Sequence, residues 1–130
     1  MLNRDIKLSV FFPAYYDEGN IGKVVTQKEL ITTIKKDLAN QGLNSKEIAD
    51  FVDFWQDHLP KTPYVKLTWL TTEEMNVLAP LEVSPKPDTI IRVFLDAKGL
   101  EKPIPFTAQK LTKIERNGFT LVEWGGLLIK

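Results

Sequence analysis

The chain has 130 residues, 43% of them hydrophobic and 26% charged, and its 17 basic residues (Lys and Arg) balance its 17 acidic residues (Asp and Glu). This length predicts a single globular domain over residues 1–130, with a core that needs no disulfides. The zero formal net charge argues against nucleic-acid binding driven by phosphate attraction and against a basic membrane-surface protein. Because cysteine is absent, disulfides, thiolate zinc sites and cysteine nucleophiles are excluded.

No targeting segment is evident. The start, Met1–Asp5, lacks the apolar h-region of a signal peptide, and no apolar run approaches the ~20 residues of a membrane span. We therefore expect a soluble chain without membrane insertion, with its compartment left open.

The first predicted strand, residues 6–12, alternates apolar and polar positions and ends at Pro13. The loop behind it contains Tyr15, Tyr16 and Asp17. It could be a recognition loop, because tyrosine is a rigid amphipathic contact residue. The commoner arrangement places such tyrosines over the edge of the core with their hydroxyls in water.

Two helices, about residues 27–41 and 45–58, are predicted to form an αα-hairpin. Each begins with the spacing of a capping box, Thr26 with Glu29 and Asn44 with Glu47. Each carries an apolar stripe of helical period, and Gly42 occupies the position of a left-handed residue after the first helix. On the first helix, Asp37 is expected to lie off the apolar stripe.

The rest of the chain predicts mostly strands. A strand over residues 64–70 precedes a short helix over residues 73–78. Residues 84–96, with Arg92 the only charge in their apolar part, are typical of a central strand buried on both faces. Residues 97–99 are expected to form a turn.

Near the C-terminus, residues 109–114 are either an edge strand or coil. Asn117-Gly118 is the strongest hairpin signal in the chain, and a strand over residues 119–124 follows it. Gly125-Gly126 is expected to break that strand. The order of elements indicates an α+β fold, a mainly antiparallel sheet with the αα-hairpin packed on one face.

The residues offer little support for catalysis. His58 is the only histidine, no metal-ligand spacing surrounds it, and no serine lies in a nucleophile elbow. Phosphate-binding glycine loops are also absent. We therefore assign no catalytic residue, no metal site and no cofactor. Asp88, Asp96 and Glu123 are nominated as carboxylates for a hydrolase only because strand ends can converge.

Aromatic side chains provide the other candidate site. Trp69 alternates with core positions, whereas Trp124, at a strand end before two glycines, is expected to be the better exposed of the two. A sugar-binding platform would use Trp124, Tyr15 and Tyr16, with Asp17 or Glu123 beside them.

Several motifs resemble a known family. They are Ala79–Phe94 (APLEVSPKPDTIIRVF), Gly118–Gly126 (GFTLVEWGG), and Gly42–Ile48 (GLNSKEI) followed by Phe54-Trp55. Together they resemble the C-terminal half of a family of uncharacterised, often exported bacterial proteins found in candidate-phylum genomes. The similarity runs from about residue 22 to residue 126. It implies a compact module that recurs in surface or periplasmic proteins. An extracytoplasmic location is suggested by this resemblance alone, since export is implied only for the longer relatives. No activity is assigned to that family, so the resemblance carries over no catalytic residues.

The sequence favours a non-enzymatic structural or protein-binding module, whose partner would be another protein or a cell-envelope component. The alternatives are a carbohydrate-binding module that uses exposed aromatic residues and, less favoured, a carboxylate-dependent hydrolase.

Overall fold

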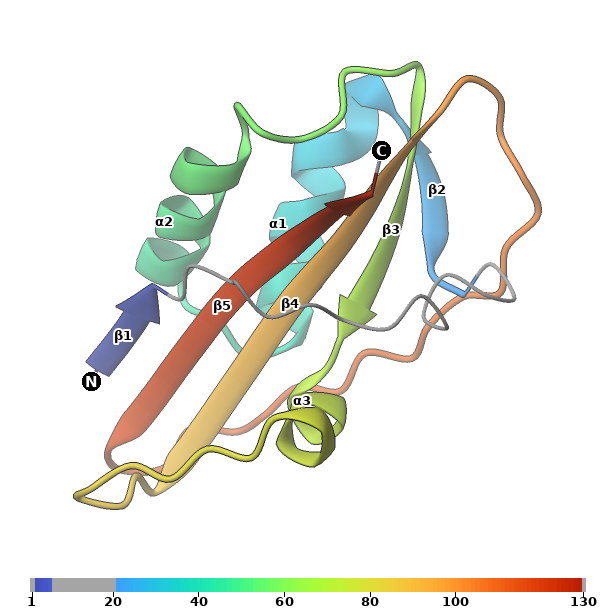
Figure 1. Ribbon diagram of the computed structural model, residues 1–130. Coiled ribbons are helices and arrows are strands. Elements are labelled where there is room, and N and C mark those ends of the chain that lie inside the picture. Colours follow the sequence, from blue (N-terminus) through green and yellow to red (C-terminus); the bar gives the residue numbers. More distant parts are fainter. Residues whose placement is uncertain (1, 6–20, 130) are drawn as a thin grey trace.

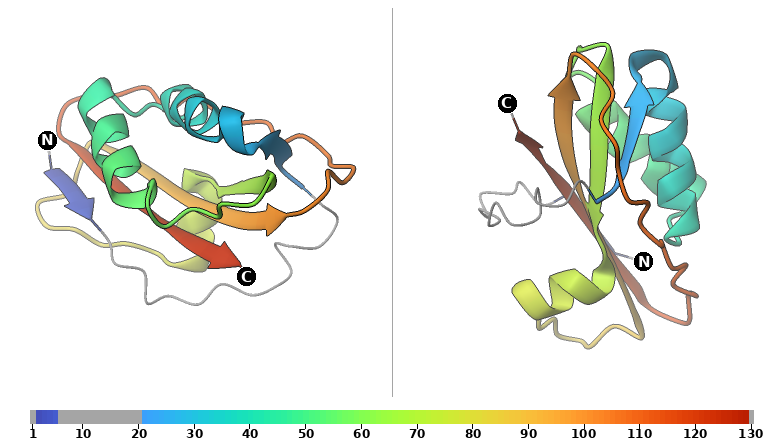
Figure 2. Two further views of the ribbon diagram at one scale, coloured as in Figure 1. Left: turned by 90° about the horizontal axis from the view of Figure 1, so that it is seen from above. Right: turned by 90° about the vertical axis from the view of Figure 1, so that its right-hand side faces the viewer.

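A computed structural model of the protein describes residues 2–5 and 21–129 (Figure 1). A five-stranded sheet in the order β1-β5-β4-β3-β2 forms its middle layer. Helices α1 and α2 cover one face of the sheet and α3 lies on the other (Figure 2). The strands are β1 (Leu2–Asp5), β2 (Lys23–Thr26), β3 (Tyr64–Leu70), β4 (Thr89–Leu100) and β5 (Thr120–Ile129); the helices are α1 (Leu30–Asn40), α2 (Ser45–Trp55) and α3 (Thr72–Leu78).

The α+β class, with a helical hairpin on one face of the sheet, is confirmed. The sheet is mixed. β2–β3 and β3–β4 pair antiparallel, whereas β4–β5 and β1–β5 pair parallel. The predicted strand over residues 6–12 lies outside the described residues.

The helix starts follow directly from the local sequence. Thr26 with Glu29, Asn44 with Glu47, and Thr71 with Glu74 each form a complete capping box, in which side chain and backbone cap each other. The first box opens a 3-10 turn over residues 27–29, which leads into α1. Gly42 has the expected positive φ, +109°. All of these features depend on residues within one or two turns of each other.

β4 is confirmed as the central strand, since it pairs along its length with β3 and β5. Its odd-numbered residues face α1 and α2 and its even-numbered residues face α3, so both faces are buried. The main core lies on the α1/α2 side. There the ring of Phe51 lies 6.0 Å from that of Trp69 and 5.2 Å from that of Trp124.

Two expected interruptions do not occur. β4 continues through residues 97–99, where Gly99 pairs with Val65. β5 continues through Gly125 and Gly126 to Ile129. At Gly126 an added Cβ would lie 3.0 Å from a ring carbon of Trp55 and 3.0 Å from the carbonyl oxygen of Leu95. Glycine at this position therefore allows α2 to approach β5 closely, and it does not end the strand.

The expected hairpin at Asn117-Gly118 is wrong. Gly118 does take a positive φ, +62°, but the chain before it is coil, and β5 runs parallel to β4. Parallel neighbours require a long crossover, and residues 101–119 provide it (Figure 1). This crossover passes Gly22 and Trp69, where Thr107 accepts a backbone hydrogen bond and Gln109 binds the strand.

Candidate functional site

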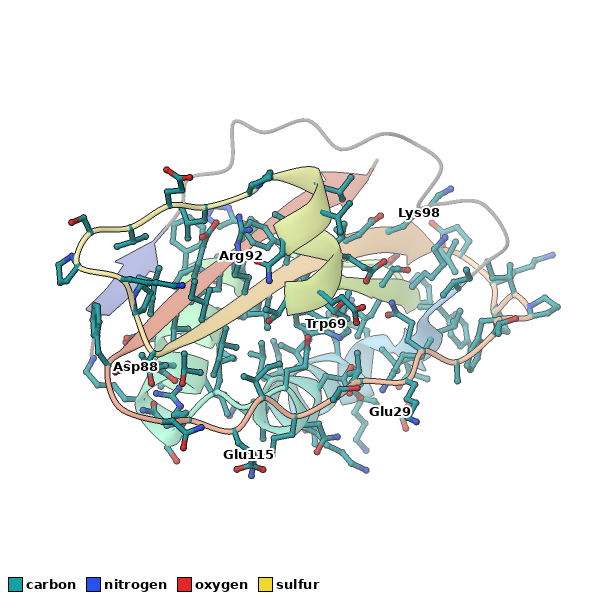
Figure 3. The ribbon with its side chains drawn as sticks, turned by 90° about the horizontal axis from the view of Figure 1, so that it is seen from below. Glu29, Trp69, Asp88, Arg92, Lys98 and Glu115 are labelled. Carbon is teal, nitrogen blue, oxygen red and sulfur yellow. The ribbon has the colours of Figure 1, made fainter. Side chains whose placement is uncertain are left out.

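Asp88, one of the three nominated carboxylates, holds the turn into β5. Its Oδ2 accepts a hydrogen bond from the backbone N–H of Phe119 at 2.8 Å, and its own N–H donates to the Phe119 carbonyl at 2.8 Å. Next to it, the Thr89 hydroxyl bonds both the N–H and the carbonyl of Asn117. Figure 3 shows Asp88 where β4 begins. This carboxylate therefore fastens the end of the crossover to the start of the central strand.

Glu123, the second nominee, is paired with Arg92 on the α3 side of the sheet. The two residues are direct neighbours in the β4–β5 ladder, and both side chains are buried. Arg92 Nη2 donates to Oε1 at 3.4 Å, and Nε lies 3.3 Å from Oε2. Because a buried carboxylate and a buried guanidinium neutralise each other here, Glu123 is occupied by an ion pair.

Arg92 also holds the C-terminal end of α3 (Figure 3). Its Nη1 donates to the carbonyl oxygens of Met75 and Ala79, at 3.0 and 2.7 Å, and to Oδ1 of Asn76 at 3.2 Å. At the other end of the helix, the Thr72 hydroxyl bonds the backbone N–H and carbonyl of Arg92. One residue of β4 therefore fixes both ends of α3 against the sheet.

Asp96, the third nominee, is not brought to Glu123. It lies opposite Thr68 on β3 and Leu127 on β5, whereas Glu123 lies opposite Arg92. The four residue steps from Arg92 to Asp96 span roughly 13 Å of strand. Asp96 is buried on the α3 side of the sheet, as is Lys66 of β3. The strand register therefore does not assemble the carboxylate pair that a hydrolase would need.

The expected exposure of Trp124 is wrong. Its side chain is only 4% exposed and faces α2, where Phe51 and Phe54 pack against it. Strand alternation decides this, because the residue lies on the helix side of a strand that continues past it. Tyr15, Tyr16 and Asp17 lie outside the described residues. Trp69 is confirmed as a core residue, 1% exposed.

Asp37 is a buried polar residue that the sequence pattern missed. Its carboxylate accepts hydrogen bonds from Lys23 Nζ and from the indole N–H of Trp69, both at 2.8 Å. The residue is 1% exposed. The sequence did contain a signal that Asp37 is buried: it lies one turn after Ile34, on the apolar stripe that also carries Leu38. The network is satisfied and stabilises the core, so we assign it no ligand.

A cavity of about 600 Å³ lies beside the start of β4. This volume is within the roughly 300–1,000 Å³ range of ligand pockets. Its wall comes from the connection between α3 and β4 and from one residue of the strand. The lining residues are Leu81, Glu82, Val83, Ser84, Lys86, Pro87 and Ile90.

The connection beside this cavity forms no strand or helix, bends at Ser84 and Pro85, and has backbone groups that are unpaired in the described contacts. Leu81 and Val83 are half-buried while Glu82 and Ser84 are exposed, the alternation of a strand with one covered face. In the described contacts, no hydrogen bond involves residues 80–87. The segment is held only at its ends, where Arg92 binds the carbonyl of Ala79 and Asp88 pairs with Phe119. It therefore presents free donors and acceptors at the surface.

No protein-family model, curated protein or solved structure matches this chain. Among the described residues, no group of three or more His, Asp or Glu side chains could hold a metal ion. In the same part of the chain, no helix has both the length and the apolar character needed to cross a membrane.

Proposed function

We propose that this protein is a non-enzymatic protein-binding module, which binds an extended peptide segment of its partner alongside residues 81–84. The observation that carries this proposal is the unpaired backbone of these residues beside the apolar side of the cavity. Strand addition uses these two features together, because main-chain hydrogen bonds give affinity and pockets for alternate side chains give specificity.

The chemistry of the partner follows from the lining. Leu81, Val83 and Ile90 provide apolar surface, while Glu82 and Lys86 place one charge of each sign beside it. A matching peptide is extended, has apolar side chains at every second position, and has little net charge. Its apolar side chains enter the cavity, and its backbone pairs with residues 81–84.

The two alternatives from the sequence gain no comparable support. A sugar platform at Trp124 would need an exposed ring, and a hydrolase would need two carboxylates together. The bacterial, extracytoplasmic family resemblance remains a hypothesis that fits a binding module without specifying its partner.

The proposal is tested with two synthetic nonapeptides of the same composition. One alternates Val and Thr, and the other groups the Val residues in one block. We expect the alternating peptide to shift the amide NMR signals of residues 81–84 and Ile90 at submillimolar concentration, and to slow hydrogen exchange of the amides of residues 81–84. The blocked peptide should do neither.

Val83→Asp places a charge in the cavity wall and should weaken binding at least tenfold. Val77→Asp is the matched control, since Val77 is 78% exposed on α3 and does not line the cavity. Equal binding of both peptides, shifts that map to other residues, or equal losses in the two variants would overturn the proposal.

A further inference from the structure

A second, smaller cavity lies between the end of α1, the start of α3 and the crossover. Its volume is about 160 Å³, and its polar lining residues are Gln41, Thr71, Thr72, Glu73, Lys110 and Thr112. None of these residues lines the larger cavity beside β4. At the roughly 30 Å³ that a water molecule occupies in the liquid, the smaller cavity has room for a ligand of about five non-hydrogen atoms.

The wall that the crossover provides is fastened on both sides of this cavity. On one side, the Gln109 amide binds the backbone N–H and carbonyl of Trp69. On the other side, the N–H of Ile114 donates to the carbonyl of Gln41 at 3.4 Å. Residues 110–113 lie between these two anchors, so the cavity has a fixed frame before any ligand enters.

The side-chain amide of Gln41 is buried but only partly satisfied. The residue is 3% exposed, and its Nε2 donates to the carbonyl of Asp37 at 3.3 Å. In the described contacts, no donor binds its Oε1. Buried amide oxygens almost always have a hydrogen-bond partner, because leaving one without a partner costs free energy. Since Gln41 lines the cavity, a ligand with an N–H donor can bind this oxygen there.

One charge of each sign also lines the cavity. Glu73 lies in the first turn of α3 and Lys110 on the crossover, and neither forms an ion pair in the described contacts. An anion would be attracted by Lys110 and repelled by Glu73, and a cation would meet the opposite pair of forces. A ligand that carries both charges is attracted by both residues.

We infer that this cavity binds a small zwitterionic amino acid of about the size of free glycine. Its ammonium group donates to the carboxylate of Glu73 and to Oε1 of Gln41. Its carboxylate accepts from the ammonium group of Lys110 and from the hydroxyl of Thr112. Such a ligand matches the cavity in volume and in both charges, and its contacts with Glu73 and Lys110 are charge-assisted hydrogen bonds.

The test is an amide NMR titration of the full chain with up to about 20 mM glycine at constant ionic strength, a range suited to the low affinity of so small a ligand. We expect saturable shifts of the side-chain amide of Gln41 and of the backbone amides of Lys110 and Thr112. Acetate and methylammonium each keep one of the two charges and should bind at least tenfold more weakly. No saturable shift with glycine, shifts confined to other residues, or equal binding of acetate or methylammonium would overturn the inference.

Two variants locate the binding site. Lys110→Gln and Glu73→Gln each remove one charge, and each should weaken glycine binding at least tenfold. Lys113→Gln is the matched control, since Lys113 is an exposed crossover residue that does not line the cavity. Unchanged glycine binding in a folded Lys110→Gln variant, or an equal loss in the control, would contradict the inference. Because the two cavities share no lining residue, this inference and the proposed peptide binding can fail separately.

Discussion

The guanidinium of Arg92 and the carboxylate of Glu123 form a buried ion pair on the α3 side of the sheet, with Nε 3.3 Å from Oε2. Each residue is the only charge in the apolar part of its strand, and parallel pairing of β4 with β5 places them opposite each other. The same arginine holds the last turn of α3, from which the cavity-lining connection leaves. The pair therefore links the sheet to the candidate binding site.

Glu123→Leu should lower the free energy of unfolding by about 3–5 kcal/mol, because it leaves the Arg92 charge buried without its partner. Urea denaturation measures this loss. The double variant Arg92→Met/Glu123→Leu removes both charges and should be more stable than the sum of the two single losses predicts. Single losses that add to within about 0.5 kcal/mol would show that the two residues are not coupled.

Gly118→Ala should destabilise the turn into β5 by about 2 kcal/mol or more. The residue has φ +62°, where a side chain costs about 1–2 kcal/mol, and an added Cβ would lie 2.3 Å from Asp88 Oδ2. Thermal or urea unfolding measures the loss. In an Asp88→Ala background the two closest contacts, with Oδ2 and Cγ, are absent and only the contact with Cβ at 3.2 Å remains, so the further cost of Gly118→Ala should fall. An equal cost in both backgrounds would contradict this explanation.

Gln109→Ala should expose part of the β3 edge. The Gln109 amide accepts a hydrogen bond from the Trp69 N–H and donates one to the Trp69 carbonyl, both at 2.8 Å, and so takes the place of a neighbouring strand. Losing both bonds should cost about 1–3 kcal/mol. Hydrogen exchange at the Trp69 amide should accelerate, whereas Lys110→Ala, at an exposed neighbour, should leave it unchanged. Unaltered exchange in Gln109→Ala would contradict the assignment.

The pKa of Glu29 reports on the capping box that this residue forms with Thr26. It lies below its ordinary value because the Thr26 hydroxyl, and then the Thr26 backbone N–H, hydrogen-bond the carboxylate. The folded-state pKa of Glu29 therefore lies below its unfolded value. The stability that the ionised carboxylate contributes is present above the unfolded pKa and is lost as the pH falls through the folded pKa.

Thr26→Val removes the hydroxyl and should raise the pKa of Glu29 toward its ordinary value, as measured by carboxyl ¹³C NMR titration. Thr26→Ser keeps the hydroxyl and should leave it low. A pKa that stays unchanged in Thr26→Val would mean that the capping hydrogen bond is not the cause.

The helices and most strands could be predicted from the sequence because their signals are local. The capping boxes before α1, α2 and α3 lie within single helical turns, and β3 matches its predicted range, residues 64–70. The apolar run with Arg92 as its only charge correctly indicated a central strand, since a strand covered on both faces has no polar side. These features required no knowledge of which segments meet.

The candidate site and the strand directions were decided by the tertiary structure. Gly118 takes the positive φ that its sequence indicates, but no hairpin forms, because the segment before it is held by long-range contacts, such as the pair between Gln109 and Trp69. β5 consequently runs parallel to β4, Trp124 faces the core, and Glu123 meets Arg92. Strand direction and register depend on residues far apart in the chain, so local periodicity could place each residue on one face of its strand but could not say what covers that face.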